Sequence, residues 1–170
     1  VDFVLNHRSY FESHSLSFFE MTVGLAFSYF LEKKVDIAVI EVGMGGRLDG
    51  TNLIKPELCL ITNIGWDHMQ FLGDTLAEIA AEKAGIIKSH TPVIIGSTQI
   101  ETQAIFREKA RQLNAEIIFA DQKDIKEYSF HLDNETKKHF LDPLHLHRVC
   151  RYFYENNKEA FALHFLESSL

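Results

Sequence analysis

The apolar residues of this chain form short continuous runs, which alternate with longer stretches in which apolar residues recur at helical spacing. The short runs are rich in β-branched residues, as buried strands are, and they span 35–41, 57–64, 92–96 and 116–120. The helical stretches cover 17–33, 75–88 and 99–113. This alternation predicts an α/β fold with a mainly parallel sheet flanked by helices.

The helix predicted over 17–33 begins with a capping box. Ser17 can accept a hydrogen bond from the first turn while Glu20 reaches back to it. The polar face of this helix is thin, so we expect the helix to pack on the sheet. Phe18 and Phe19 are accordingly expected in the core.

The helix predicted over 75–88 also opens with a capping box, Thr75 and Glu78, and it carries an apolar stripe that contains a lysine. The stripe consists of Leu76, Ile79, Ala80, Lys83 and Ile87. An ammonium group is costly to bury unless it is paired or chemically modified. Lys83 therefore either performs a function on that face or extends its amine to solvent.

A glycine-rich polar segment follows the first predicted strand. Glu41 ends that strand, and three glycines and several polar residues follow within 43–52. Glycines let the backbone turn sharply and approach a ligand closely. The second predicted strand also leads into polar residues, Asp67 and His68. If the two strands are parallel, these groups emerge at one edge of the sheet, where open α/β sheets bind ligands.

The last part of the chain is less regular. Residues 128–132 could form one more strand, but beyond residue 132 the strand–helix alternation is lost. Helices are expected there around 144–155 and 157–167. We therefore assign 1–132 to a partial α/β domain and leave 133–170 unassigned, with a helical tail as the expectation.

Composition narrows the classes of function. The chain has 170 residues, 46% of them hydrophobic, which suffices for a domain with a core. A net charge of -7 without a basic face argues against nucleic-acid binding. Cys59 and Cys150 have neither metal-binding nor disulfide spacing. No stretch approaches the length of a membrane-spanning helix and no signal peptide is evident, so we expect a cytoplasmic protein with no membrane partner.

Several short motifs occur in order over about residues 1–120. They are Ser17-Phe18-Phe19-Glu20, Glu41-Val42-Gly43-Met44-Gly45-Gly46-Arg47-Leu48-Asp49, Thr51-Asn52, Ile61-Thr62-Asn63-Ile64-Gly65, Asp67-His68, Leu72-Gly73 and Glu82-Lys83-Ala84-Gly85-Ile86-Ile87-Lys88. Each is weak alone, but together they resemble folylpolyglutamate synthase and the bifunctional dihydrofolate synthase/folylpolyglutamate synthase of the Mur ligase superfamily. The resemblance implies the central, ATPase-type α/β domain of such an enzyme, truncated at both ends.

The resemblance further implies a monomeric, ATP-dependent ligase of folate metabolism that uses Mg²⁺. In this reaction a carboxylate of dihydropteroate or a folate becomes an acyl phosphate, which the amine of L-glutamate attacks. The residues that resemble the family's metal site are Glu41, His68 and Lys83, with His68 and a carbamylated Lys83 in the catalytic role. The residues that resemble its nucleotide-site loop are Arg47, Asp49, Thr51 and Asn52, and Asp67 resembles a supporting residue.

Two expectations concern the ends of the chain. The family's glycine-rich phosphate-binding loop would precede residue 1, and its C-terminal domain would follow the tail. We therefore expect this chain by itself to be inactive as a ligase. Two alternatives stay open. One is a peptidoglycan Mur ligase acting on a UDP-linked muramoyl substrate, which the Gly-Gly-Arg-Leu-Asp sequence disfavours. The other is a non-catalytic remnant of a degraded gene.

Overall fold

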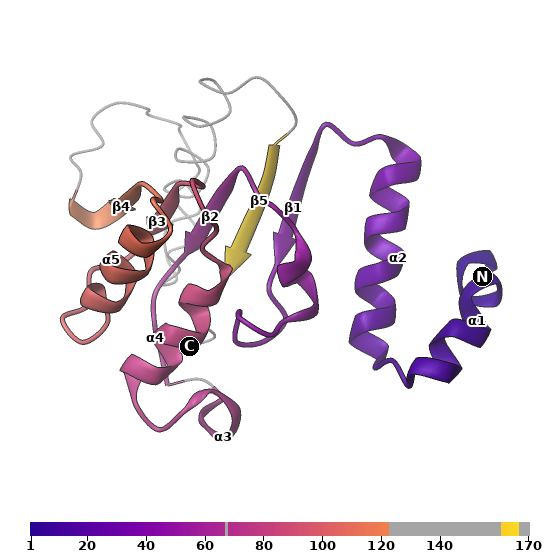
Figure 1. The fold of residues 1–170 in the computed structure, drawn as a ribbon, viewed down its shortest axis with the longest axis horizontal. Helices are drawn as coiled ribbons and strands as arrows, with labels where there is room; N and C mark the ends of the chain where they lie inside the picture. The colour runs from indigo at the N-terminus through magenta and orange to yellow at the C-terminus, as the bar shows by residue number, and fades with distance from the viewer. Residues whose placement is uncertain (67, 123–160, 167–170) are drawn as a thin grey trace, which may run out of the picture.

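The computed structural model of this protein describes residues 1–66, 68–122 and the backbone of 161–166. These residues form a five-stranded sheet with the order β1-β5-β2-β3-β4, in which each pair of neighbours is parallel. The strands are β1 (Ile37–Glu41), β2 (Leu58–Ile61), β3 (Val93–Ile95), β4 (Ile117–Phe119) and β5 (Phe161–Leu166). The predicted α/β fold with a parallel sheet is confirmed, and Figure 1 shows β1, β5 and β2 side by side.

Strand β5 corrects the expectation of a helical tail. The sequence predicts a helix over 157–167, but residues 161–166 form a strand between β1 and β2. A short apolar segment can become either a helix or a strand, and here the two flanking strands supply backbone partners on both sides. The strand expected at 128–132 and the helix expected at 144–155 lie outside the described residues.

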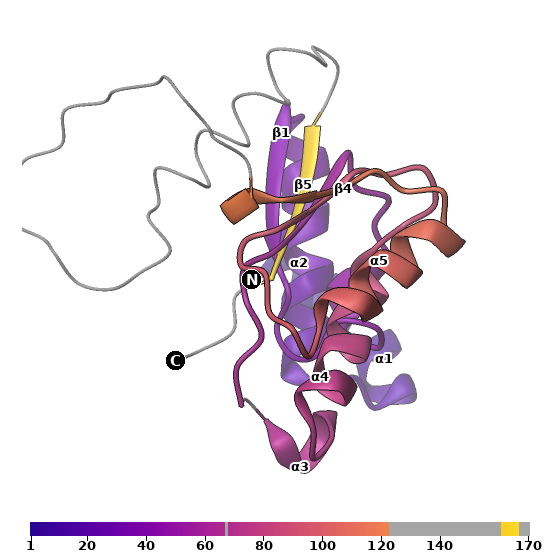
Figure 2. The same cartoon turned by 90° about the vertical axis from the view of Figure 1, so that its left-hand side faces the viewer.

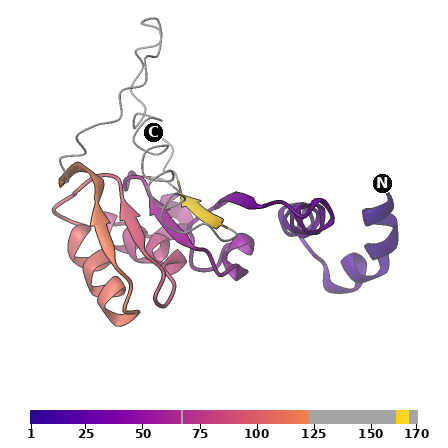
Figure 3. The ribbon, with the colours of Figure 1, turned by 90° about the horizontal axis from the view of Figure 1, so that it is seen from above.

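Helices α4 (Leu76–Lys83) and α5 (Gln103–Gln112) lie on one face of the sheet, as Figures 1 to 3 show. Helix α4 begins with the predicted capping box at Thr75. Buried side chains of both helices pack with β2, β3 and β4 into one core, which includes Ile61, Ile79, Val93, Phe106 and Phe119. Cys59 is fully buried in this core, and burial raises the pKa of its thiol to about 12, as expected of an inert core cysteine.

Helix α2 (Phe18–Lys33) has the predicted capping box at Ser17, but it does not pack on the sheet as expected. Figure 3 shows α2 and α1 (Asp2–His14) extending beyond β1, away from the other strands. Val23 is the buried residue of α2, while Phe18 and Phe19 are 81% and 42% exposed. Their expected core placement is wrong because α2 lies beside the edge of the described sheet rather than over its face.

Strand β1 is the terminal strand on its side of the described sheet. The sequence predicts burial on both faces for 35–41, but Ile40 is buried whereas Ile37 and Val39 are 41% and 61% exposed. The apolar run sets the strand conformation, whereas burial depends on which elements cover the strand, and the core under α4 and α5 is centred on β2 and β3. None of the described helices is long and apolar enough to span a bilayer.

Candidate active site

Asp49 forms hydrogen bonds with residues on both sides of it in the glycine-rich segment that follows β1. One carboxylate oxygen of Asp49 accepts a hydrogen bond from the Met44 amide over 2.9 Å. The other accepts from the amide and the hydroxyl of Thr51 over 2.9 and 2.5 Å, and so caps the 3-10 turn η1 (Gly50–Leu53). We call residues 42–52 the glycine loop. Asp49 therefore fixes the path of this loop between Met44 and Thr51.

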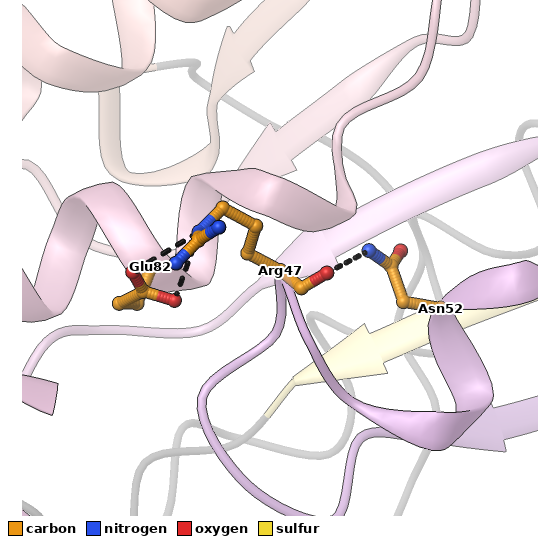
Figure 4. A network of polar contacts seen from close by, with 3 residues as sticks. All are labelled: Arg47, Asn52 and Glu82. Carbon is orange, nitrogen blue, oxygen red and sulfur yellow. Dashed lines mark hydrogen bonds and ion pairs between the residues drawn. The ribbon is translucent and has the colours of Figure 1, made fainter. Parts of the chain in front are cut away.

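Arg47 and Asn52 bind the glycine loop to the end of α4 and the turn that follows it. Figure 4 shows the bonds of Arg47 to Glu82 and of Asn52 to Arg47. The Arg47 guanidinium donates from Nε and Nη2 to the Glu82 carboxylate over 3.1 and 3.0 Å, and the Arg47 amide donates to the Glu82 carbonyl over 2.9 Å. The Asn52 amide nitrogen donates to the carbonyls of Arg47 and Gly85 over 3.0 and 3.2 Å. The loop is thus held at several points against the residues that flank Lys83.

Gly85 allows this close approach. A Cβ atom at position 85 would lie 2.5 Å from Arg47 Cα and 2.9 Å from Arg47 N, which is too close for backbone atoms to tolerate. We therefore expect Gly85→Ala to separate the glycine loop from α4 and to lower the free energy of unfolding by about 1–3 kcal/mol, measured by urea denaturation.

Gly24→Ala is the matched control for Gly85→Ala. Gly24 lies inside α2, where the nearest atom to an added Cβ is Phe3 Cζ at 3.8 Å. Because alanine favours a helix over glycine, this variant is expected to be more stable than wild type by about 0.5–1 kcal/mol. Equal stabilities for Gly85→Ala and wild type would contradict the observed docking of the loop.

Lys83 lies in the core at the end of α4, as its position on the apolar stripe predicts. Its side chain is 2% exposed, and Ile79, Ala80 and Ile87 on the same stripe are buried as well. The alternative in which the amine extends freely into solvent does not fit this burial. Lys83 directly follows Glu82, so the buried lysine is next in the chain to the residue that binds Arg47 of the glycine loop.

Glu41 and His68 occupy the ends of two other elements around the glycine loop. Glu41 ends β1 with an exposed side chain. β1 and β2 are both parallel to β5, so their carboxyl ends share one edge of the sheet, as predicted. His68 precedes α3 (Met69–Leu72) with a φ of 46°, and its carbonyl accepts hydrogen bonds from Phe71 and Leu72. Asp67 lies outside the described residues.

A cavity of about 580 Å³ opens between the glycine loop, the start of α2 and α3. Its lining combines apolar side chains with carboxylates, and includes Phe19, Met44, Leu48, Phe71, Glu20 and Asp49. Hydrogen bonds from the hydroxyl and amide of Ser17 lower the pKa of Glu20 and keep it ionised. This size and mixture are typical of small-molecule sites.

The pattern of residues along the chain does not predict this cavity. It places Phe19 in the core and indicates no role for Phe71. A signal was present in Gly43, where an added Cβ would lie 2.7 Å from Phe19 Cε2, so the absence of a side chain there lets the ring approach the loop. The reason for a glycine at position 43 can be recognised only once the structure places α2 beside the glycine loop.

The described residues fit a magnesium site only in part. No three or more His, Cys, Asp or Glu side chains among them gather into one group. Magnesium, however, usually binds one or two carboxylates and completes its shell with water and substrate phosphates. The exposed carboxylate of Glu41 at the carboxyl edge of the sheet fits that mode, whereas an unmodified Lys83 ammonium cannot donate to a metal.

Comparison with known proteins identifies the family to which this chain belongs. The model of the Mur ligase middle domain matches residues 7–165. The dihydrofolate synthase/folylpolyglutamate synthase of Bacillus subtilis is 48% identical over 95 residues, which cover 55% of this chain and 22% of that protein. The structure of a mutant L. casei folylpolyglutamate synthase matches with a TM-score of 0.65 at 34% identity, over 69% of this chain and 31% of that one.

A complex of folylpolyglutamate synthase with AMPPCP and folate matches with the same TM-score of 0.65 at 34% identity, over 69% of this chain and 30% of that one. The chain therefore spans between about a fifth and a third of the length of these relatives. Since the family model covers most of the residues, the chain belongs to the Mur ligase middle-domain family.

Proposed function

We propose that the protein to which these residues belong is an ATP-dependent ligase that adds L-glutamate to dihydropteroate or a folate. One observation carries the proposal. The glycine loop is bound to the end of α4, so that a strand-end carboxylate, a buried lysine and a cavity surround a single loop. The relatives named as dihydrofolate and folylpolyglutamate synthases support the folate branch over a peptidoglycan ligase.

The proposed reaction has two steps. A carboxylate oxygen of the folate substrate attacks the γ-phosphorus of ATP, which forms an acyl phosphate and releases ADP. The amine of glutamate then attacks the acyl carbon, a C–N bond forms, and phosphate leaves. Mg²⁺, when bound, offsets the negative charge of the phosphates.

Within this chain, Glu41 is proposed as a magnesium ligand, and His68 as a second donor. Lys83 would join them if carbamylation replaced its ammonium with a carboxylate-like group. Arg47, Asp49, Thr51 and Asn52 are proposed to serve the nucleotide site by fixing the glycine loop. Their hydrogen bonds run within that loop and to the end of α4, which supports a role in shaping the loop.

The test of the nucleotide site is calorimetry with Mg²⁺–AMPPCP on this chain. Wild type is expected to bind, and binding is expected to disappear in Glu41→Ala and after addition of a chelator. Glu57→Ala is the control, because Glu57 is an exposed carboxylate just before β2, at the opposite edge of the sheet. Binding that survives in Glu41→Ala would contradict the metal assignment, and no binding by wild type would mean that nucleotide binding needs the phosphate-binding loop expected before residue 1.

Binding and turnover are separate expectations. The chain corresponds to less than a third of its synthase relatives, so we expect no glutamate addition from these 170 residues alone. Measurable ATP-dependent glutamate addition by the isolated chain would contradict this expectation.

The cavity beside the glycine loop is proposed to hold the flat pterin ring of the substrate. Phe19 and Phe71 offer aromatic surfaces, and the ionised Glu20 offers an acceptor for ring N–H groups. Phe71→Ala is expected to weaken dihydropteroate binding by about tenfold in a fluorescence titration. Phe71 is 70% exposed, so the unfolding midpoint should stay unchanged.

Tyr29→Ala is the control for Phe71→Ala. Tyr29 is an aromatic residue of α2 that is 53% exposed and does not line the cavity. Equal losses of affinity in the two variants would contradict the assignment of the cavity.

A further inference from the structure

The side-chain amide of Gln99 makes two hydrogen bonds with the backbone of Ile64. The Ile64 amide donates to Gln99 Oε1 over 2.7 Å, and Gln99 Nε2 donates to the Ile64 carbonyl over 2.7 Å. This is the pair of bonds that a neighbouring strand would make with one residue. Ile64 itself is 3% exposed, so its backbone groups would be costly to leave without partners.

Gln99 binds Ile64 beyond the ends of the two strands. The Gly96 amide donates to the Ile61 carbonyl over 2.8 Å, next to the end of the β2–β3 pair. In the described structure β2 ends at Ile61 and β3 at Ile95, and the chain after β3 leads into α5. Gln99 extends the pairing by three residues, to Ile64, with a side chain instead of a backbone.

The position of Gln99 is itself fixed. Its carbonyl accepts from the amides of Thr102 and Gln103 over 3.2 and 2.9 Å at the start of α5. Its neighbour Thr98 is held toward β4, because the amide and hydroxyl of Thr98 donate to the Asp121 carboxylate over 2.6 and 2.7 Å. Thr98 and Gln99 thus connect three strand ends at the carboxyl edge of the sheet.

His68 lies four residues beyond Ile64 in the sequence. Trp66, two residues after Ile64, is 62% exposed, so its side chain adds little packing there. We propose that Gln99 is a positioning residue, whose amide fixes the backbone at Ile64 and thereby helps to place His68 in the proposed metal site. The role of His68 in this statement rests on the proposed function, whereas the fixing of Ile64 does not.

Amide hydrogen exchange read by NMR tests the ordering directly. Gln99→Met keeps the length of the side chain but removes both hydrogen bonds, so the Ile64 amide is expected to exchange at least about fivefold faster than in wild type. Gln112→Met is the matched control, because it makes the same substitution at an exposed glutamine that binds Glu108, and it is expected to leave Ile64 unchanged. Unchanged exchange in Gln99→Met overturns the inference.

Gln99→Glu separates the hydrogen bonds from mere packing. At neutral pH its carboxylate can accept from the Ile64 amide but faces the Ile64 carbonyl without a proton to donate. On protonation the acid can make both bonds, so protection of the Ile64 amide should rise as the pH is lowered, after correction for the intrinsic exchange rate. A pH-independent protection factor would overturn the assignment to paired hydrogen bonds.

Calorimetry with Mg²⁺–AMPPCP tests the positioning of His68. Affinity is expected to fall at least about fivefold in Gln99→Met and to stay unchanged in Gln112→Met. Faster exchange with unchanged affinity would overturn the positioning role. If wild type binds no nucleotide, these residues do not form the proposed nucleotide site by themselves, and the exchange experiment alone decides whether Gln99 fixes the backbone at Ile64.

Discussion

Leu163→Pro is expected to unfold the central part of the sheet. Position 163 lies in the middle of β5, which pairs with β1 on one side and β2 on the other, opposite Val39 and Leu58. Proline has no amide hydrogen and a fixed φ, so it is excluded from central strands. The expected loss is about 3 kcal/mol or more of unfolding free energy.

Thermal denaturation followed by circular dichroism measures this loss. Leu163→Val is the control, because valine keeps the amide hydrogen and favours strands. It is expected to differ from wild type by less than about 1.5 kcal/mol. Similar melting curves for the proline and valine variants would contradict the placement of β5 between β1 and β2.

Lys83→Met is expected to weaken ligand binding and also to lower stability. Lys83 is 2% exposed and has an interaction partner within the protein. Methionine has a similar volume and removes the desolvation penalty of the ammonium, but it cannot replace that interaction. We expect the unfolding free energy to fall by about 1–3 kcal/mol and Mg²⁺–AMPPCP affinity to fall by at least about tenfold.

Urea denaturation and calorimetry on the same samples measure both effects. Lys55→Met, at an exposed position between the glycine loop and β2, should change neither property. Unchanged Mg²⁺–AMPPCP affinity in Lys83→Met would mean that the lysine serves the core alone and not a ligand. Carbon-13 NMR in labelled bicarbonate would report a carbamate on Lys83, and no such signal in wild type would contradict the proposed modification.

The pattern of residues along the chain determined the local structure. β-branched apolar runs predicted β1 to β4, and capping boxes at Ser17 and Thr75 predicted where α2 and α4 begin. The burial of Lys83 followed from its place on a helical stripe. These features depend on residues a few positions apart, so hydrogen-bonding and hydrophobic periodicity suffice to predict them.

Only the tertiary structure decided the features that join distant segments. β5 became a strand because β1 and β2 offer backbone partners from positions more than 100 residues away. The exposure of β1 and α2 depends on which elements cover them, and the cavity exists only where α2, α3 and the glycine loop meet. The hydrogen bonds of Arg47 to Glu82 and of Gln99 to Ile64 each span 35 residues, and no local periodicity specifies such pairs.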